Sequence, residues 1–276
     1  MSYLIFAILL FIFSIFAGIV GSLTGLGGGV VIIPILVLVF HVDIHIAMGT
    51  SLIAILATSS GASIAYSRQG LTNFRIGIFL ETITVIAAFV GASLVAYFPS
   101  AFLMILFSCI LFLSAYLSFT RQEQNERYTT SHPWAMALKM QGYYQQKPYF
   151  VQNVPYALTI MGGAGFLAGL LGIGSGALKV LAMDQALRLP YKISTATSNF
   201  MIGITAAASA GVYLFHDYIV PGLVFPVMIG VLIGSYSGSR VLRIVSTNFL
   251  RVFFSIIIVL AGIQMLYEAW ITMHAY

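Results

Sequence analysis

The sequence predicts an all-α membrane protein with about eight to ten transmembrane segments. We expect two inverted-topology repeats with glycine-broken half-helices. Three observations predict this fold class. Of the 276 residues, 60% are hydrophobic and 7% charged, whereas a soluble domain carries about 25% charged residues. The apolar residues form ten separate runs, and an ungapped shift of 147 residues superposes glycine clusters from the two halves of the chain.

The ten runs have the character of membrane helices, because charges are nearly absent and most runs approach the roughly 20 residues that cross a bilayer. They cover 3–24, 28–40, 46–66, 76–97 and 101–119, and then 154–171, 176–189, 193–213, 222–239 and 249–270. The second and seventh runs are short, and each is entered through glycines. No basic region precedes the first run, so we interpret it as a retained span rather than a signal peptide.

A single long polar stretch divides the chain into three parts. Residues 1–119 form the predicted first membrane repeat, 120–153 a solvated cytoplasmic linker, and 154–276 the second membrane repeat. A small surface helix near Trp134–Met140 is compatible with the linker. No separate soluble domain is expected.

Basic residues predict the orientation, because Lys and Arg concentrate in cytoplasmic loops. The loop after the third run carries Arg68 and Arg75, but its equivalent at 214–222 carries neither Lys nor Arg. The loop at 98–101 is uncharged, but its equivalent carries Arg240, Arg243 and Arg251. This exchange predicts two halves of opposite orientation in a multi-pass protein of the cell (inner) membrane. The expected inside segments are 67–75, 120–153, 188–192 and 240–251, and the expected outside segments are the N-terminus, 41–45, 98–100 and 214–222.

The glycine clusters are the predicted substrate site. GLGGG contributes Gly25, Gly27, Gly28 and Gly29, and GIGSG contributes Gly174, Ser175 and Gly176. Glycines allow the chain to break, and broken backbone inside a membrane is tolerated where it lines a cavity. The helix that follows directs free N–H groups and its positive dipole end into that cavity, which favours an anion. Tight helix packing through small residues is the alternative.

Polar side chains near the clusters extend the predicted site. Lys179 lies four residues into the seventh run, at a depth where a charge is costly and generally functional. Hydroxyl and amide groups that can donate to an oxyanion follow each cluster; they belong to Thr50, Ser51, Thr197, Ser198 and Asn199. Their alternative role is helix capping or interhelical hydrogen bonding.

Two acids, Asp184 and Glu81, are the candidates for coupling transport to an ion. Structural alternatives remain open for both acids. Lys179 could pair with Asp184 in the same run, and Glu81 could lie near a helix end beside Arg75.

Several other functions are disfavoured by the sequence. Ser175 would need a neighbouring base to act in a hydrolase, and all five histidines fall in loops or at chain ends. The same placement argues against a buried metal site, and the single cysteine, Cys109, excludes a disulfide framework. The glycine spacing matches neither a dinucleotide fingerprint nor a P-loop.

Two segments resemble the repeats of the TauE/SafE sulfite-exporter family. They are GLGGGVVIIPIL at 25–36 and GLLGIGSGALKVLAMDQALRLPYKISTATSNFMIGITAAASAGVY at 169–213. The resemblance covers most of the chain outside the linker and implies transport of small sulfur-containing anions, such as sulfite or organosulfonates, often outward. Two positions depart from the family pattern: Ser175 replaces a glycine, and Leu181 replaces the proline that matches Pro34. The second departure predicts a less strictly broken second half-helix.

The sequence therefore predicts a secondary transporter of a small anion, most specifically a sulfur-containing oxyanion that it exports, and not an enzyme. An uncoupled anion channel or facilitator of the same fold is the alternative. The expected partners are the anionic substrate and the lipid bilayer, with homo-oligomerisation left open. No cofactor, metal or nucleic acid is expected.

Overall fold

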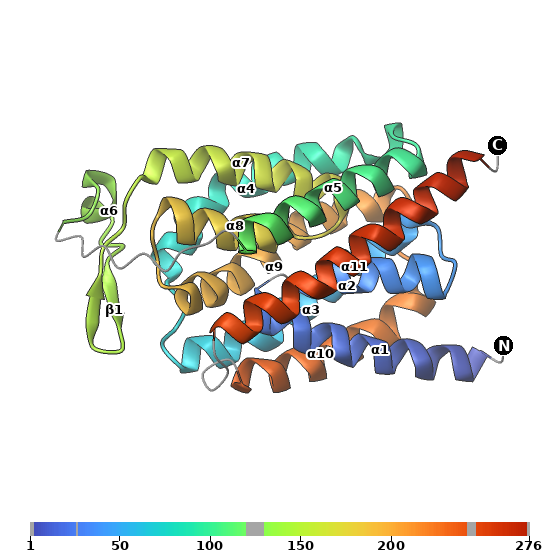
Figure 1. Cartoon of the computed structure of the whole chain (residues 1–276), viewed down its shortest axis with the longest axis horizontal. Coiled ribbons are helices and arrows are strands. Elements are labelled where there is room, and N and C mark those ends of the chain that lie inside the picture. Colours follow the sequence, from blue (N-terminus) through green and yellow to red (C-terminus); the bar gives the residue numbers. More distant parts are fainter. Residues whose placement is uncertain (1–2, 26, 120–129, 242–246, 275–276) are drawn as a thin grey trace.

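The computed structural model describes residues 3–25, 27–119, 130–241 and 247–274. Long helices run along a common axis, and the two termini lie at one end of the bundle (Figure 1). The first half contains α1 (Tyr3–Thr24), α2 (Gly29–Pro34), η1 (Ile35–Val39), α3 (Ile44–Arg68), α4 (Phe74–Ser93), η2 (Val95–Tyr97) and α5 (Ser100–Phe119). The second half contains α7 (Val154–Leu171), α8 (Gly176–Leu181), η3 (Ala182–Ala186), α9 (Tyr191–Phe215), α10 (Pro221–Val241) and α11 (Thr247–His274).

Each of the ten apolar runs forms helix, with boundaries close to those predicted. Local chemistry explains two of the starts. Asp43 precedes α3 and accepts a hydrogen bond from the backbone N–H of His45 at 2.8 Å. Asn73 precedes α4 and accepts one from Ile76 at 3.2 Å. Such N-caps satisfy backbone donors that a helix start leaves free.

Seven of the helices are long and apolar enough to cross a membrane: α1, α3, α4, α7, α9, α10 and α11. Two further apolar helices, Gly29–Val39 and Ser100–Tyr116, are shorter over the residues searched. The helical membrane architecture is thus confirmed, but fewer segments than the expected eight to ten meet this criterion. The eleven residues of α2 and η1 extend only about 16 Å, roughly half of the hydrocarbon core.

The described part of the linker is folded onto the bundle. It contains α6 (Pro133–Ala137) and an antiparallel hairpin of β1 (Gly142–Tyr144) and β2 (Lys147–Tyr149), in which Gly142 pairs with Tyr149. Ala135, Met140 and Val151 are buried in a cluster with side chains of the bundle. Asn73 attaches this part to the start of α4 by donating to Met140 O and Tyr149 Oη, both at 2.8 Å. Residues 120–129 of the predicted linker lie outside the described residues.

Helix packing follows the correspondence between the halves. Helix α1 packs on α10, and α7, its equivalent in the second half, packs on α4. The pairs α3–α9 and α5–α11 each join equivalent helices. Individual hydrogen bonds repeat too: Tyr66 Oη donates to Ser22 O at 2.7 Å, and Tyr213 Oη donates to Gly169 O at 3.1 Å. The 147-residue shift relates both members of these bonds.

Contacts between loops define the two ends of the bundle. At the termini end, His45 Nε2 lies 3.4 Å from Phe98 O, and its ring lies 5.1 Å from that of Tyr218. At the opposite end, here called the hairpin end, Gln69 donates to Ser239 O at 3.3 Å and Gln152 N donates to Leu187 O at 3.2 Å. Loops that the sequence assigns to one side therefore contact each other at one end of the bundle; residues 242–246 of the 240–251 segment lie outside the described residues.

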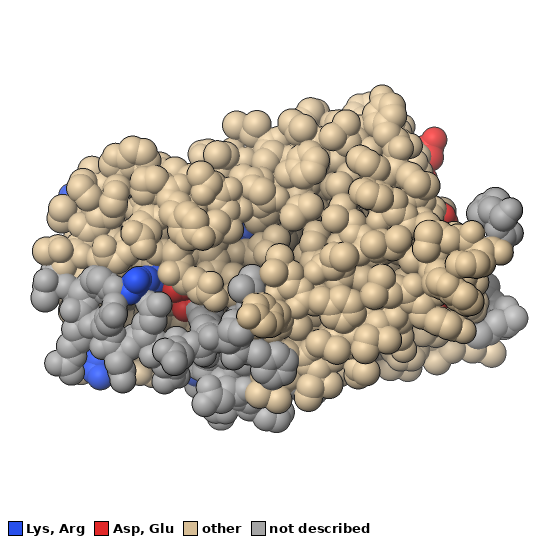
Figure 2. Space-filling view, turned by 45° about the horizontal axis from the view of Figure 1, so that its top comes forward, with Lys and Arg blue, Asp and Glu red and all other residues tan. Residues whose placement is uncertain are grey.

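Charge is distributed unequally between the two ends. Basic residues gather at the hairpin end, where they flank the long helices or lie in the hairpin segment. Apart from the buried Lys179, the described ones are Arg68, Arg75, Lys139, Lys147, Arg188, Lys192 and Arg240. Asp43 and Asp217 lie in loops at the termini end, next to the paired rings of His45 and Tyr218. Figure 2 shows a broad face that is almost uncharged across its middle. An apolar belt between polar ends is what a bilayer requires.

Candidate functional site

The two glycine clusters are genuine breaks in the helical backbone. Gly25, Gly27 and Gly28 have φ values of 80°, 77° and 75°. The equivalent positions, Gly172, Gly174 and Ser175, have φ values of 63°, 67° and 49°. This left-handed conformation costs a residue with a Cβ about 1–2 kcal/mol. Both breaks therefore adopt the same backbone shape, although serine stands at one position.

The second half-helix is broken as strictly as the first, contrary to the expectation from its missing proline. Helices α2 and α8 both have six residues, and a five-residue π-helical turn follows each. Pro34 ends α2, while Leu181 ends α8. The left-handed residues before the helices and the π-helical turns after them set the geometry, so proline is not needed.

The two breaks approach the same pair of isoleucines from α3 and α9. A Cβ placed on Gly27 would lie 2.6 Å from Cδ1 of Ile202 and 3.0 Å from Cγ2 of Ile55. A Cβ placed on Gly174 would lie 3.2 Å from Cδ1 of Ile55 and 3.5 Å from Cβ of Ile202. Both isoleucines are fully buried, near the middle of their 25-residue helices. The breaks thus converge at the centre of the bundle, with two apolar side chains against them.

Two serines cross-link the halves at this centre. Ser51 Oγ on α3 donates to Gly172 O at 2.9 Å, and Ser198 Oγ on α9 donates to Gly25 O at 2.8 Å. Ser198 Oγ also lies 3.3 Å from Gly176 O. Each serine therefore donates a hydrogen bond to a backbone carbonyl in the break of the other half, where the interrupted helix does not provide the regular helical hydrogen bond. The structure brings these two predicted residues to the breaks.

Other predicted polar residues are placed differently. Thr197 Oγ1 accepts the backbone N–H of Asn73 at 3.0 Å, so it supports the start of α4 instead of facing a break. Asn199 Nδ2 donates to Ser22 O at 3.1 Å and Thr195 O at 3.0 Å. Thr50 is buried without a hydrogen-bond partner among the described residues.

Two further buried hydroxyls near the breaks lack partners in the described part of the chain. Ser175 precedes α8 without capping it, and its Oγ is unpaired at 2% exposure. Thr195 Oγ1 is also unpaired, and the residue lies 3.2 Å from the position of a Cβ on Gly25. An unsatisfied buried hydroxyl costs about 1–3 kcal/mol. A bound polar ligand would remove this cost.

Lys179 is the most deeply buried charge of the described residues. Its side chain has zero exposure, and Nζ donates to Glu81 Oε2 at 2.9 Å and Oε1 at 3.2 Å. The Thr205 hydroxyl is within hydrogen-bonding distance of both charged groups. Glu81 is 3% exposed. Lys179 lies about one turn after the break before α8, and groups of α4 and α9 hold its ammonium.

The ion pair corrects both structural alternatives considered for these charges. Lys179 pairs with Glu81 on α4, not with Asp184, which lies in η3. Arg75 donates instead to Lys139 O at 3.0 Å. Asp184 was a predicted coupling residue but is not part of this cluster. The sequence did not indicate Thr205, Thr195, Ile55 or Ile202; the one available signal was that Thr205 and Ile202 align with Thr58 and Ile55 under the 147-residue shift.

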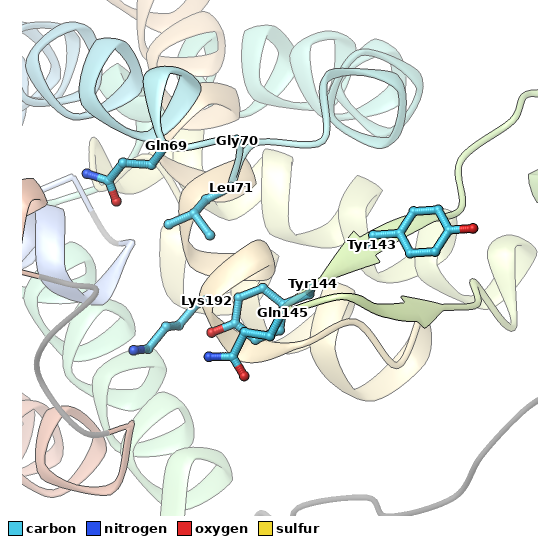
Figure 3. A pocket seen from close by; sticks show the side chains of 7 residues that line it. All are labelled: Gln69, Gly70, Leu71, Tyr143, Tyr144, Gln145 and Lys192. Carbon is cyan, nitrogen blue, oxygen red and sulfur yellow. The ribbon is translucent and has the colours of Figure 1, made fainter.

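A separate cavity of about 220 Å³ lies at the hairpin end. Residues 69–71, hairpin residues 143–145 and Lys192 line it (Figure 3). Tyr143 points away from the other labelled side chains in this view. No predicted site residue lines the cavity. Over the described residues, no group of three or more His, Cys, Asp or Glu side chains is arranged to hold a metal ion.

The candidate membrane helices surround buried, broken half-helices and a buried ion pair. This arrangement defines a multi-pass membrane transporter. The chain belongs to the family described as "Sulfite exporter TauE/SafE", whose profile matches residues 10–265. It is a transporter of this family and not an enzyme.

Similar proteins carry matching descriptions. The probable membrane transporter protein YunE of Bacillus subtilis is 27% identical over 269 residues, covering 95% of this chain and 97% of that protein. YdhB of the same organism, also named a probable membrane transporter protein, is 28% identical over 251 residues, covering 91% and 96%. A probable membrane transporter protein of Xylella fastidiosa is 24% identical over 264 residues, covering 94% and 95%. No solved structure matches the chain.

Proposed function

We propose that the protein is a secondary transporter that exports a small sulfur-containing oxyanion, such as sulfite or an organosulfonate. The anion binds where the two glycine breaks converge. The family description supports this substrate class, and an oxyanion matches the donors available near the breaks. Backbone N–H groups at the starts of α2 and α8 and the hydroxyl of Ser175 can all donate to it.

The observation that carries the proposal is the convergence of the breaks beside a buried cation. Gly27 and Gly174 contact the same pair, Ile55 and Ile202, and Lys179 begins its side chain about one turn after the second break. Fully buried charge is expensive in a membrane protein and is retained where it serves transport. Positive charge together with free N–H groups selects an anion over a neutral solute or a cation.

The closed packing at this centre favours a carrier over an open anion channel. Ile55, Ile202 and Lys179 all have zero exposure. A continuous pore would leave some of these central side chains accessible to water. An anion therefore reaches the centre only when packing around the isoleucines changes, as in alternating access.

We also propose that the two halves are inverted repeats. The reciprocal hydrogen bonds of Ser51 and Ser198 support this arrangement. The packing of α1 on α10 supports it too, because the equivalent helices α7 and α4 pack on each other in the same way. Helix α1 begins at the termini end and α7 begins beside the hairpin at the other end (Figure 1). A two-fold axis in the membrane plane would relate such halves.

A binding screen of the purified protein tests the proposed function. Sulfite, thiosulfate, sulfate, methanesulfonate and a carboxylate are compared by thermal shift and by flux into reconstituted vesicles. The sulfur oxyanions should bind and cross, and Gly27→Leu and Gly174→Leu should abolish flux while the protein still inserts. Normal flux in both variants would show that the breaks only pack helices. Preference for the carboxylate would overturn the substrate class.

A further inference from the structure

The Lys179–Glu81–Thr205 cluster occurs in only one of the two pseudo-equivalent places in the bundle. The 147-residue shift maps Lys179 to Ile32, Glu81 to Met228 and Thr205 to Thr58. Ile32 is fully buried, Met228 packs against the same hydrophobic core, and Thr58 bonds to Ala54 O in its own helix. The same helical framework thus exists with apolar side chains at these positions, so packing alone does not require the ion pair.

The electrostatics of the cluster add a second argument. Replacing a buried ion pair by apolar residues is often neutral or stabilising, because desolvation offsets the attraction. A buried pair is therefore weak evidence for a stabilising role. The ion pair also occupies the ammonium of Lys179, which has Glu81 Oε1, Glu81 Oε2 and the Thr205 hydroxyl as hydrogen-bond partners. An anion can contact Lys179 only by displacing the carboxylate.

We infer that Glu81 is the proton-coupling residue of the carrier and that it occupies Lys179 when no substrate is bound. This inference rests on the proposed function. In the empty state, the ammonium of Lys179 and the carboxylate of Glu81 sum to zero charge. When a monovalent anion takes the place of the carboxylate, Glu81 accepts one proton from water on the open side, and the site again sums to zero. No bond within the anion changes.

Charge neutrality explains why binding of the anion and protonation of Glu81 are linked. An anion beside Lys179 and an ionised Glu81 would bury two negative charges against one positive charge, which the low-dielectric interior disfavours. Of the described residues in the helices around Glu81, α8 supplies Lys179 and α9 supplies Thr205, while Met161 of α7 and Met201 of α9 belong to the adjoining apolar cluster. Lys179 is the titratable side chain in contact with Glu81. One anion and one proton therefore cross together, and net export is driven by the outward gradient of the anion itself.

The ratio of protons to anions tests this inference. The full chain is reconstituted in vesicles that contain a pH-sensitive dye, and methanesulfonate and thiosulfate serve as probes, because neither titrates between mildly acidic and neutral pH. We expect one proton for each anion with both probes. Methanesulfonate flux should be insensitive to membrane potential, whereas thiosulfate should carry one net negative charge. Flux of either anion without proton movement overturns the inference and leaves the proposed function intact.

Variants give an independent readout. Glu81→Gln should lose proton movement and make methanesulfonate flux independent of pH but sensitive to membrane potential, while Glu268→Gln on α11 should keep the wild-type ratio. Retained proton movement in Glu81→Gln rejects the inference. If Glu81→Gln does not fold, two other variants test the inference. Glu81→Asp must keep the ratio of one proton to one anion. The double variant Lys179→Ile with Glu81→Met, which copies the equivalent residues of the first half, must fold but show no coupled flux. Absence of flux and binding for every anion in wild type would overturn the proposed function, and the coupling with it.

Discussion

Ser51 and Ser198 make equivalent hydrogen bonds across the interface between the halves, so removal of either hydroxyl should have a similar effect. Each serine is fully buried and donates to a carbonyl of the opposite break, Gly172 O or Gly25 O. An alanine there leaves a buried acceptor unsatisfied, which costs about 1–3 kcal/mol. We expect Ser51→Ala and Ser198→Ala each to lower the melting temperature of the purified protein, whereas Ser60→Ala, at an exposed position of α3, should not. A large effect from only one serine would contradict the equivalence of the breaks.

Ser175 offers a way to separate backbone strain from substrate contact. Its φ of 49° is unfavourable for any residue with a Cβ, and the equivalent residue is Gly28. Ser175→Gly should therefore fold at least as well as wild type but bind methanesulfonate more weakly, because a donor is lost. Ser175→Ala loses the same donor and keeps the strain. Equal binding by wild type and Ser175→Gly, measured by calorimetry, would exclude the hydroxyl from the site.

The burial of individual charged residues was easier to predict from the sequence than the residues with which they pair. Lys179 was identified because a charge four residues into an apolar run must be buried. Its partner could not be identified, because Glu81 lies 98 residues away and the pairing depends on how α4 and α8 pack. Thr197 was assigned to the site because it repeats with the glycines, yet its hydroxyl faces Asn73. Sequence spacing does not fix which side of a helix faces a buried neighbour when every side is buried.

The convergence of the broken helices depends on how closely Gly27 approaches α9. An added Cβ would lie 2.6 Å from Cδ1 of Ile202, in a left-handed backbone. We expect Gly27→Ala to reduce anion flux strongly. Ile202→Val removes the obstructing Cδ1 at a cost of about 0.5–1.5 kcal/mol, so the double variant should be more stable than the sum of the two single changes predicts.

The same experiment needs a control for glycine loss. A Cβ on Gly211 in α9 meets no atom within 4 Å, so Gly211→Ala should leave flux unchanged. Additive effects of Gly27→Ala and Ile202→Val, measured by thermal unfolding, would show that the two residues do not interact.

Apolar run lengths predicted all ten helical segments, because hydrophobicity and backbone hydrogen bonding dictate helix formation in a membrane. The two short segments were expected from their glycines. The equally strict break before the second one was not, because Leu181 in place of a proline suggested a less strictly broken half-helix. The buried contacts of Ala135, Met140 and Val151 were also missed. A hairpin within a polar stretch has no apolar run to reveal it.

The whole molecule has a basic end and a less basic end, and this asymmetry predicts its orientation. Basic loops are retained on the cytoplasmic side during insertion. Four segments meet at the hairpin end: loop 69–73, loop 187–190, the β1–β2 hairpin and the end of α10. We therefore expect this end to face the cytoplasm, with both termini outside. The sequence is enough for this prediction because orientation depends on the positions of charges along the chain and not on side-chain packing.

Accessibility of single cysteines tests this orientation. The exposed Cys109 is first replaced by alanine, and cysteines are then introduced at Gly70, Gln145, Ser100 or Asp217. Gly70 and Gln145 lie at the hairpin end, while Ser100 and Asp217 follow the loops of the termini end. In intact cells, an impermeant maleimide should label the cysteines at 100 and 217, and those at 70 and 145 should react only after the membrane is opened. The reverse pattern would invert the orientation and place the hairpin end outside the cell. Labelling of 70 and 217 from the same side would contradict the bundle itself, because the structure separates these loops by the full length of α3 and α9.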